Sequence, residues 1–141
     1  MNQPHRILAI DDDPLTLHIV EHVLQKHGYE VFTAYNGHDG LELAFILKPD
    51  LVILDIMMPG LDGFQVCRKL RENPETAVTT ILMLTARGAI DKPANDPVDF
   101  AQRVRDQLNG YRVGASDFLT KPVKAAVLVE RVRSLIWSGK N

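Results

Sequence analysis

The sequence has a single cysteine, Cys67, and it lacks any long apolar run. One cysteine cannot form an internal disulfide, so we expect the protein to work in a reducing compartment. Every apolar stretch is far shorter than the roughly 18–20 residues that a membrane helix needs. The first residues also lack the apolar core of a signal peptide. We therefore expect a soluble, cytoplasmic domain that makes no contact with a membrane.

An excess of either charge is also missing. Lysine and arginine number 16, aspartate and glutamate number 18, and the formal net charge is -2. A nucleic-acid-binding surface normally needs a strong basic excess, so we expect no direct nucleic-acid binding by this domain. A chain of 141 residues is within the usual size of one domain. We expect a single domain over 1–141, with its core at about 5–137.

Short apolar runs and helical patterns alternate along the chain. We expect strands at 7–10, 29–34, 51–54, 80–84 and 117–120, and helices at 14–27, 38–47, 63–72, 96–111 and 124–137. This alternation favours right-handed crossovers and an α/β fold, a parallel sheet with helices on both faces. The interval between Thr85 and Asp117 is longer than a loop and a helix need. It predicts an insert at about 88–98, followed by a long fourth helix.

Acidic residues follow two of the apolar runs. Asp11 and Asp12 follow the first run, and Asp55 follows the third. A buried unpaired charge costs several kcal/mol, so we expect Asp55 at the mouth of its strand rather than in the core. Open α/β sheets bind ligands at the carboxyl ends of their strands. Thr85 and Lys121, at the ends of the fourth and fifth strands, are therefore expected at the same edge.

This combination of side chains has a definite chemistry. Clustered carboxylates repel one another unless a cation is present, so we expect a hard divalent ion at this edge. Only oxygen ligands are available, which favours Mg²⁺ or Mn²⁺ over Zn²⁺. The hydroxyl of Thr85 can donate to a phosphate oxygen, and the ammonium of Lys121 can neutralise another. The site therefore predicts phosphoryl transfer to the carboxylate of Asp55.

Four motifs at these strand ends are familiar together. They are the segments 10–14 (IDDDP), 54–63 (LDIMMPGLDG), 84–87 (LTAR) and 118–122 (FLTKP). In this order the chain resembles the receiver domain of response regulators, the CheY-like domain of two-component signalling. The resemblance implies a flavodoxin-like, doubly wound sheet of five parallel strands in the order 2-1-3-4-5, with five helices. Only the insert has no counterpart in the family.

The resemblance also implies roles for the acidic residues. Asp55 would accept a phosphoryl group from a phosphohistidine of a histidine kinase or a histidine phosphotransfer protein. Asp12 and Asp55 would bind Mg²⁺ directly, together with the backbone carbonyl of Met57, and Asp11 would act through water. Such a phosphoacceptor is not an enzyme beyond its own phosphotransfer and slow autodephosphorylation.

The resemblance further implies a switch. Thr85 would move toward the phosphoryl group, and Phe118 would turn inward with it. The signal would pass to the surface of the fourth helix, fifth strand and fifth helix, which is also the homodimer surface of the family. Because the insert enlarges this surface, we hypothesise that the chain does not use the common symmetric dimer unchanged. The Lys121–Pro122 peptide bond would be cis.

Two further positions are expected to tune rates. Met57 and Arg87 each lie two residues beyond a site residue. In the family, side chains at these positions flank the phosphoryl group. A bulky apolar Met57 would obstruct the hydrolytic water, which predicts a phosphorylated state of at least moderate lifetime.

Two other functions fit the residues less well. A phosphatase with an aspartyl nucleophile generally needs a second acid two residues after the first, and that position is Met57, which cannot protonate a leaving group. A degenerate receiver that only binds a partner is disfavoured because all the site residues are present. Two contexts stay open. The chain is either a standalone relay or adaptor module, or the N-terminal part of a longer regulator with a DNA-binding or enzymatic output.

The first helix carries the remaining candidates. Leu15 and Leu17 are expected to be exposed near the acidic site, where with Pro122 and Val123 they would meet the helix of a kinase; scattered apolar surface explains them equally well. His18 and His22 lie one turn apart, a spacing that could hold a transition metal. No third ligand is evident, so we expect solvated surface histidines.

Overall fold

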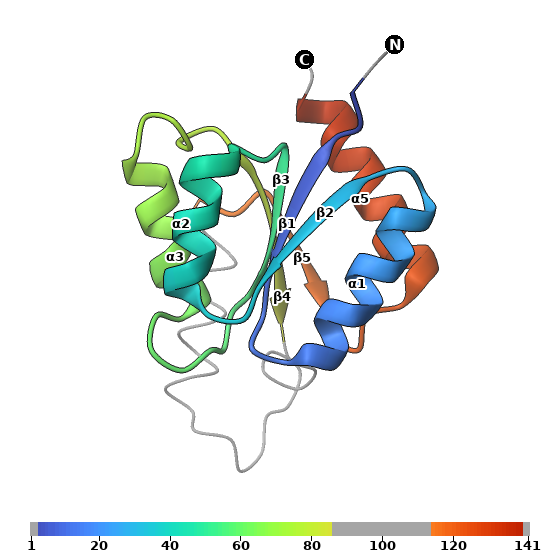
Figure 1. Ribbon diagram of the computed structural model, residues 1–141, viewed down its shortest axis with the longest axis horizontal. Coiled ribbons are helices and arrows are strands. Elements are labelled where there is room, and N and C mark those ends of the chain that lie inside the picture. Colours follow the sequence, from blue (N-terminus) through green and yellow to red (C-terminus); the bar gives the residue numbers. More distant parts are fainter. Residues whose placement is uncertain (1–2, 86–113, 140–141) are drawn as a thin grey trace.

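The fold is a twisted parallel sheet covered by helices, seen in a computed structural model that describes residues 3–85 and 114–139 (Figure 1). The strands are β1 (Arg6–Ile10), β2 (Glu30–Ala34), β3 (Leu51–Asp55), β4 (Thr80–Thr85) and β5 (Asp117–Thr120). All neighbouring strands are parallel, in the order β2-β1-β3-β4-β5. The predicted strand order is therefore confirmed.

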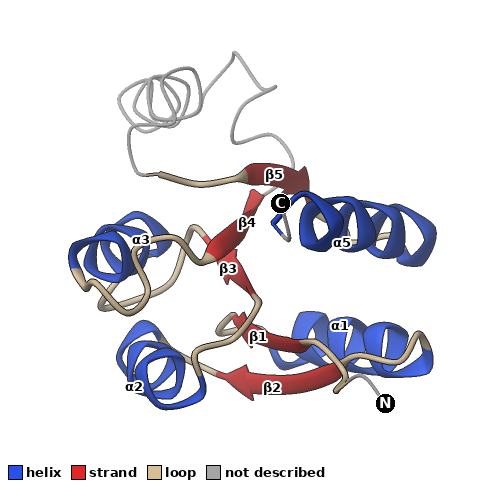
Figure 2. Cartoon of the chain, turned by 90° about the horizontal axis from the view of Figure 1, so that it is seen from above, coloured by secondary structure: helices blue, strands red, loops and turns tan. Residues whose placement is uncertain are grey.

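Four helices are found among the described residues. They are α1 (Pro14–Lys26), α2 (Gly37–Leu47), α3 (Gly63–Glu72) and α5 (Ala125–Gly139). Helices α1 and α5 cover one face of the sheet, and α2 and α3 cover the other, so the domain has three layers (Figure 2). The predicted insert at 88–98 and the fourth helix at 96–111 lie outside the described residues.

Strand side chains alternate between two cores, one on each face of the sheet. Buried residues such as Ile7, Ile53 and Leu82 point to the side of α1 and α5. Their neighbours along the strands, such as Leu8 and Val52, point to the side of α2 and α3. This period of two follows from strand geometry, and burial on both faces explains why the strands are continuous apolar runs.

The helices begin at well-capped residues near the carboxyl edge of the sheet. The side chain of Asp13 accepts a hydrogen bond from the backbone N–H of Leu15, and Pro14 occupies the first helical turn of α1. Asp62 and Gln65 form a capping box at the start of α3. Because the caps fix where each helix starts, they also fix the loops that follow β1 and β3.

One of the two leucines of α1 that were expected at the surface is buried. Leu17, expected at the surface, is only 3% exposed, whereas Leu15 is 64% exposed as predicted. Leu17, Val20 and Leu24 are spaced by three and four residues and pack together on the sheet. The sheet meets this stripe, so Ile19 is left only partly covered.

Helix α5 also buries only one side. Val127 is 37% exposed, whereas Leu128 and Val129, which follow it, are 0% and 8% exposed. Within residues 3–85 and 114–139, no helix combines the length and apolar character that crossing a membrane requires.

Candidate functional site

Three carboxylates meet where β1 and β3 end. Ile10 lies opposite Leu54 in the register of these strands, so the residues that follow, Asp11 and Asp55, come side by side. One carboxylate oxygen from each of Asp11, Asp12 and Asp55 lies within 4.8 Å of the others. The sequence prediction that brought these three residues to one edge agrees with this geometry.

The burial of Asp55 differs from the sequence prediction. Asp55 is the last residue of β3, but it is only 4% exposed, and Asp11 is 1% exposed. The Nζ atom of Lys121 lies 3.1 Å from Oδ1 of Asp55 and 2.9 Å from Oδ2 of Asp11. A carboxylate can be buried here because an ammonium group pairs with it, which the argument from an unpaired charge did not include.

The charges of the cluster alter the proton affinity of its members. Burial raises the pKa of Asp55 to about 6, and repulsion by Asp11 adds to this, while Lys121 opposes it. For Lys121, burial disfavours the charged form, but the hydrogen bond to Asp11 and the attraction of Asp55 outweigh it and raise the pKa of the ammonium group. Lys121 is therefore fully charged at neutral pH. Burial and the charge of Asp11 destabilise the ionised form of Asp55.

Thr85 ends the neighbouring strand with a hydroxyl group that has no protein partner in the described part of the chain. It is 1% exposed, and its Oγ1 atom makes no hydrogen bond to any described residue. The backbone N–H of Lys121 donates to the carbonyl oxygen of Thr85 at 2.7 Å, which ties the end of β5 to the end of β4. A buried hydroxyl without a partner is costly, and a ligand oxygen would satisfy it. The Lys121–Pro122 bond is cis, as the resemblance implied.

The loop after Asp55 is closed by a glycine. The backbone N–H of Gly63 donates to the carbonyl oxygen of Ile56 at 2.8 Å. A Cβ atom on Gly63 would collide with the carbonyl oxygen of Asp55 and lie 2.7 Å from the Cα atom of Ile56. Only glycine allows this close approach, which keeps the loop that carries Met57 beside the site. The side chain of Met57 is 51% exposed.

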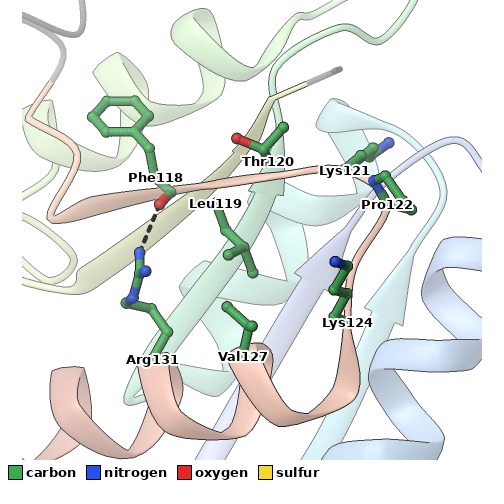
Figure 3. A pocket seen from close by; sticks show the side chains of 8 residues that line it. All are labelled: Phe118, Leu119, Thr120, Lys121, Pro122, Lys124, Val127 and Arg131. Atoms are coloured by element: carbon green, nitrogen blue, oxygen red, sulfur yellow. Dashed lines mark hydrogen bonds between the residues drawn. The ribbon is translucent and has the colours of Figure 1, made fainter.

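Phe118 lies on β5, next to a cavity of about 420 Å³ at the edge of the sheet. It is half-buried and packs against the core on the side of α2 and α3. Arg131 of α5 donates to the carbonyl oxygen of Phe118 at 2.8 Å (Figure 3). Arg131 also forms an ion pair with Asp117 at 3.2 Å. Sequence reasoning missed Arg131, because a charged residue on an amphipathic helix gives no sign of its partner.

A second arginine was also missed. Arg71, near the end of α3, donates twice to the carbonyl oxygen of Gly114, at 2.6 and 2.9 Å, and once to that of Ala77 at 3.1 Å. These bonds hold the chain that enters β5 against α3. Burial lowers the pKa of the Arg71 guanidinium group. Of the residues named from the sequence, Arg87 lies outside the described residues.

The donor set fits a small, hard cation. Asp11, Asp12 and Asp55 present only carboxylate oxygens at the cluster, and Asp12 is exposed to solvent. Carboxylate oxygens with water are the ligands that Mg²⁺ takes in proteins. A cation here would also relieve the repulsion between Asp11 and Asp55.

The geometry of the sheet and this cluster is that of a known family. The family profile described as the response regulator receiver domain matches residues 7–96. Protein PilH of Pseudomonas aeruginosa is 37% identical over 93% of this chain and 97% of its own length. The chemotaxis protein CheY4 of Vibrio cholerae is 30% identical, with a TM-score of 0.77 over 94% of this chain and 98% of that chain. The chain belongs to the receiver domains of response regulators, which are signalling proteins.

The chain also matches part of a longer protein. The DNA-binding dual master transcriptional regulator RpaA of a Synechocystis strain is 41% identical over 93% of this chain. The chain spans 48% of the length of RpaA, but nearly all of PilH. Receiver domains of this sequence type therefore occur both in short proteins and inside longer ones.

Proposed function

We propose that this domain is a phosphoacceptor. Asp55 takes a phosphoryl group from a phosphohistidine of a histidine kinase or a histidine phosphotransfer protein. The observation that carries the proposal is the buried Asp55 carboxylate with Lys121 Nζ 3.1 Å away and the partnerless Thr85 hydroxyl at the end of the next strand. A nucleophile, a cation and a hydrogen-bond donor are the groups that phosphoryl transfer needs.

In the transfer, a carboxylate oxygen of Asp55 attacks phosphorus, the bond from phosphorus to the histidine nitrogen breaks, and that nitrogen keeps the electron pair. Asp12, Asp55 and the backbone carbonyl of Met57 would hold Mg²⁺ or Mn²⁺, with Asp11 acting through water, and the ion would supply charge neutralisation. Lys121 neutralises a phosphoryl oxygen, and Thr85 donates a hydrogen bond to another. The carboxylate must be ionised to attack, and a bound cation would favour this ionised form.

The switch would use the two strands at the edge of the sheet. Thr85 follows the phosphoryl group, and Phe118 follows Thr85 because β4 and β5 are paired over this stretch. The signal would then reach the face of β5 and α5, together with the fourth helix expected from the sequence. A homodimer through that face, modified by the insert, is the assembly that the sequence favours.

Met57 would set the lifetime of the phosphorylated state. Its side chain is half-exposed, two residues beyond Asp55, and would obstruct the approach of water to phosphorus. Met57→Asn is expected to speed the loss of the phosphoryl group. An unchanged rate of hydrolysis would contradict this role. Arg87, two residues beyond Thr85, is proposed as a second tuning position.

A partner would dock beside Lys121. A cavity of about 350 Å³ there is lined by Asp13, Leu15, Thr16, Ile19, Lys121, Pro122 and Val123. It offers apolar side chains from α1 and from the β5–α5 loop next to the phosphorylation site. A kinase helix seated here would bring its phosphohistidine to Asp55. Ile19 is only partly buried and lines this cavity, so we propose that it contacts the partner in place of the buried Leu17.

Two contexts for the domain stay distinct. The near-complete match to PilH supports a standalone relay or adaptor module, with one domain over 1–141. The match to about half of RpaA supports the receiver part of a regulator with a further output domain. In both, we propose a cytoplasmic domain that does not itself bind nucleic acid.

The test is intact-mass spectrometry after incubation with acetyl phosphate and Mg²⁺. A gain of one phosphoryl group is expected, and it should be absent without the metal and absent in Asp55→Asn. A gain that persists in Asp55→Asn would move the acceptor to another residue. No gain in the unaltered protein would remove the proposed chemistry and leave only the fold.

A further inference from the structure

Two histidines on α1 form a pair that the phosphorylation site does not use. The rings of His18 and His22 are stacked, with centroids 6.2 Å apart and an angle of 11° between their planes. Both side chains are exposed. They lie one helical turn apart, so their ring nitrogens project from the same face of α1.

The other histidines of the chain have different surroundings. His27 shares a hydrogen bond with the carbonyl oxygen of Val23 through its Nδ1 atom, at 2.9 Å. His38 lies 3.7 Å from Glu42, and His5 contacts the ring of Tyr29. Within residues 3–85 and 114–139, His18 and His22 contact each other and make no hydrogen bond or ion pair. Their nitrogens are therefore available to a ligand.

We propose that His18 and His22 together bind one divalent ion of the Zn²⁺, Ni²⁺ or Cu²⁺ class. Imidazole nitrogen is a good ligand for these ions and a poor one for Mg²⁺, which prefers oxygen. Two imidazoles on one helical turn chelate the ion, and water fills the positions that the protein leaves open. Both side chains are exposed and can turn toward a common ion, and two nitrogen ligands completed by water do not require a third side chain.

This site is separate from the carboxylate cluster in chemistry and in place. The cluster of Asp11, Asp12 and Asp55 offers only oxygen and lies at the end of the sheet. The histidine pair offers only nitrogen and lies along the middle of α1. The two sites are expected to select different metals, and binding at the pair does not require phosphorylation of Asp55.

A competing cluster on α2 is a weaker candidate. His38, Asp39 and Glu42 bring ligand atoms within 4.8 Å of one another. They lie in the first turns of α2, where the partial positive charge of the helix N-terminus disfavours a cation. Asp39 also accepts a hydrogen bond from the side chain of Asn36 at 3.1 Å. This cluster supplies the control for the pair on α1.

The histidine pair shares its face of α1 with the apolar side chains of the docking cavity. Leu15, His18, Ile19 and His22 follow one another at spacings of three, one and three residues, which places them on one side of the helix. An ion on this stripe keeps coordination positions open toward solvent. It would therefore face whatever lies against α1.

The test is calorimetric titration of the untagged protein with NiCl₂ and with ZnCl₂ at pH 8, in excess Mg²⁺ so that the carboxylate cluster is occupied. One ion per chain is expected. His18→Gln and His22→Gln should each weaken binding by at least about tenfold, since each removes one of two protein ligands. His27→Gln and His38→Gln should leave the affinity unchanged.

A second measurement locates the bound ion. Bound Cu²⁺ is expected to broaden the ring-proton NMR signals of His18 and His22 before those of His5, His27 or His38. Full affinity in either His18→Gln or His22→Gln would overturn the proposal. A loss of affinity in His38→Gln alone would assign the binding to α2 instead. Phosphorylation by acetyl phosphate serves as the independent check, because it should be the same in all four variants.

Discussion

The two edges of the sheet each contain a lysine–carboxylate pair with the same geometry. At the carboxyl edge, Lys121 Nζ lies 2.9 Å from Asp11; toward the amino edge, Lys48 Nζ lies 2.9 Å from Glu75. Their exposure differs greatly. The side chains of Lys48 and Glu75 are 58% and 60% exposed, whereas those of Lys121 and Asp11 are 23% and 1% exposed. Equal distances thus describe one pair in water and one pair in the protein interior.

This difference decides what each pair can do. An exposed pair is screened by water and salt and contributes little free energy. A buried pair contributes strongly only while both partners are present, because removal of one leaves an uncompensated charge. A ligand that neutralises the buried charges of the carboxyl edge is therefore expected to stabilise the protein. No such effect is expected at the amino edge.

Lys121→Met tests the comparison most strongly. The change leaves Asp11 and Asp55 buried without an ammonium group, and we expect the metal-free protein at pH 8 to lose about 3–5 kcal/mol of unfolding free energy. Urea denaturation measures this loss. Lys124→Met, an exposed neighbour, is the matched control and should change stability little. A similar small change in Lys121→Met would mean that the buried pair is no stronger than a surface pair.

Asp55→Asn tests how strongly the buried site destabilises the ionised form of Asp55. Since the pKa of Asp55 is raised from 3.8 to about 6, the folded state binds its proton more tightly than the unfolded state. The associated stability is present below pH 3.8 and is lost as the pH rises through about 6. We expect a fall of about 3 kcal/mol over this window in metal-free protein, absent in Asp55→Asn.

Thermal unfolding at a series of pH values gives the profile. Mg²⁺ should reduce the fall, because the cation replaces the proton as the partner of the carboxylate. An identical pH profile for Asp55→Asn and the unaltered protein would show that Asp55 does not cause the fall in stability.

Gly63→Ala tests the backbone at the same edge. The new methyl group would press on the carbonyl group of Asp55 and on Ile56, so we expect a loss of about 1–3 kcal/mol. Weaker Mg²⁺ binding should accompany it, measured by titration. Gly139→Ala is the control toward the other edge, where the added Cβ meets only the side chain of Thr80, at 3.2 Å. Equal effects in the two variants would remove the special role of Gly63.

Glu75→Gln gives the smallest expected effect. Breaking the exposed pair with Lys48 should change stability by no more than about 1 kcal/mol. The difference should shrink further in 1 M NaCl because salt screens the pair. A larger loss that salt does not reduce would show that exposure is not what separates the two edges.

The sequence predicted the parts of the fold that depend on local pattern. Apolar runs marked all five strands, and the helix expected at 14–27 corresponds to α1, Pro14–Lys26. The carboxylates of Asp11, Asp12 and Asp55 could be placed together because parallel strands bring their carboxyl ends to one edge. Where pattern was ambiguous, as at Leu17, the prediction was wrong, since only the packed sheet decides which stripe of a helix is covered.

Partners across long separations were beyond sequence reasoning. Nothing near Arg71 indicates that it binds the carbonyl oxygen of Gly114, 43 positions away. Likewise, the burial of Asp55 depended on the reach of Lys121 across the sheet. Both cases join a charged side chain to a group on another element, and no local periodicity records such a contact.

The contacts of Lys121 with Asp11 and Asp55 also have a consequence for the short strand β5. Asp117–Thr120 has four residues and pairs only with β4 among the described strands. Lys121, directly after it, connects this edge to Asp11 and Asp55, across the end of β4. The same lysine that neutralises the site therefore also restrains local opening of the outermost strand. The protection of the β5 amides from hydrogen exchange should consequently rise and fall with the charge on Asp55.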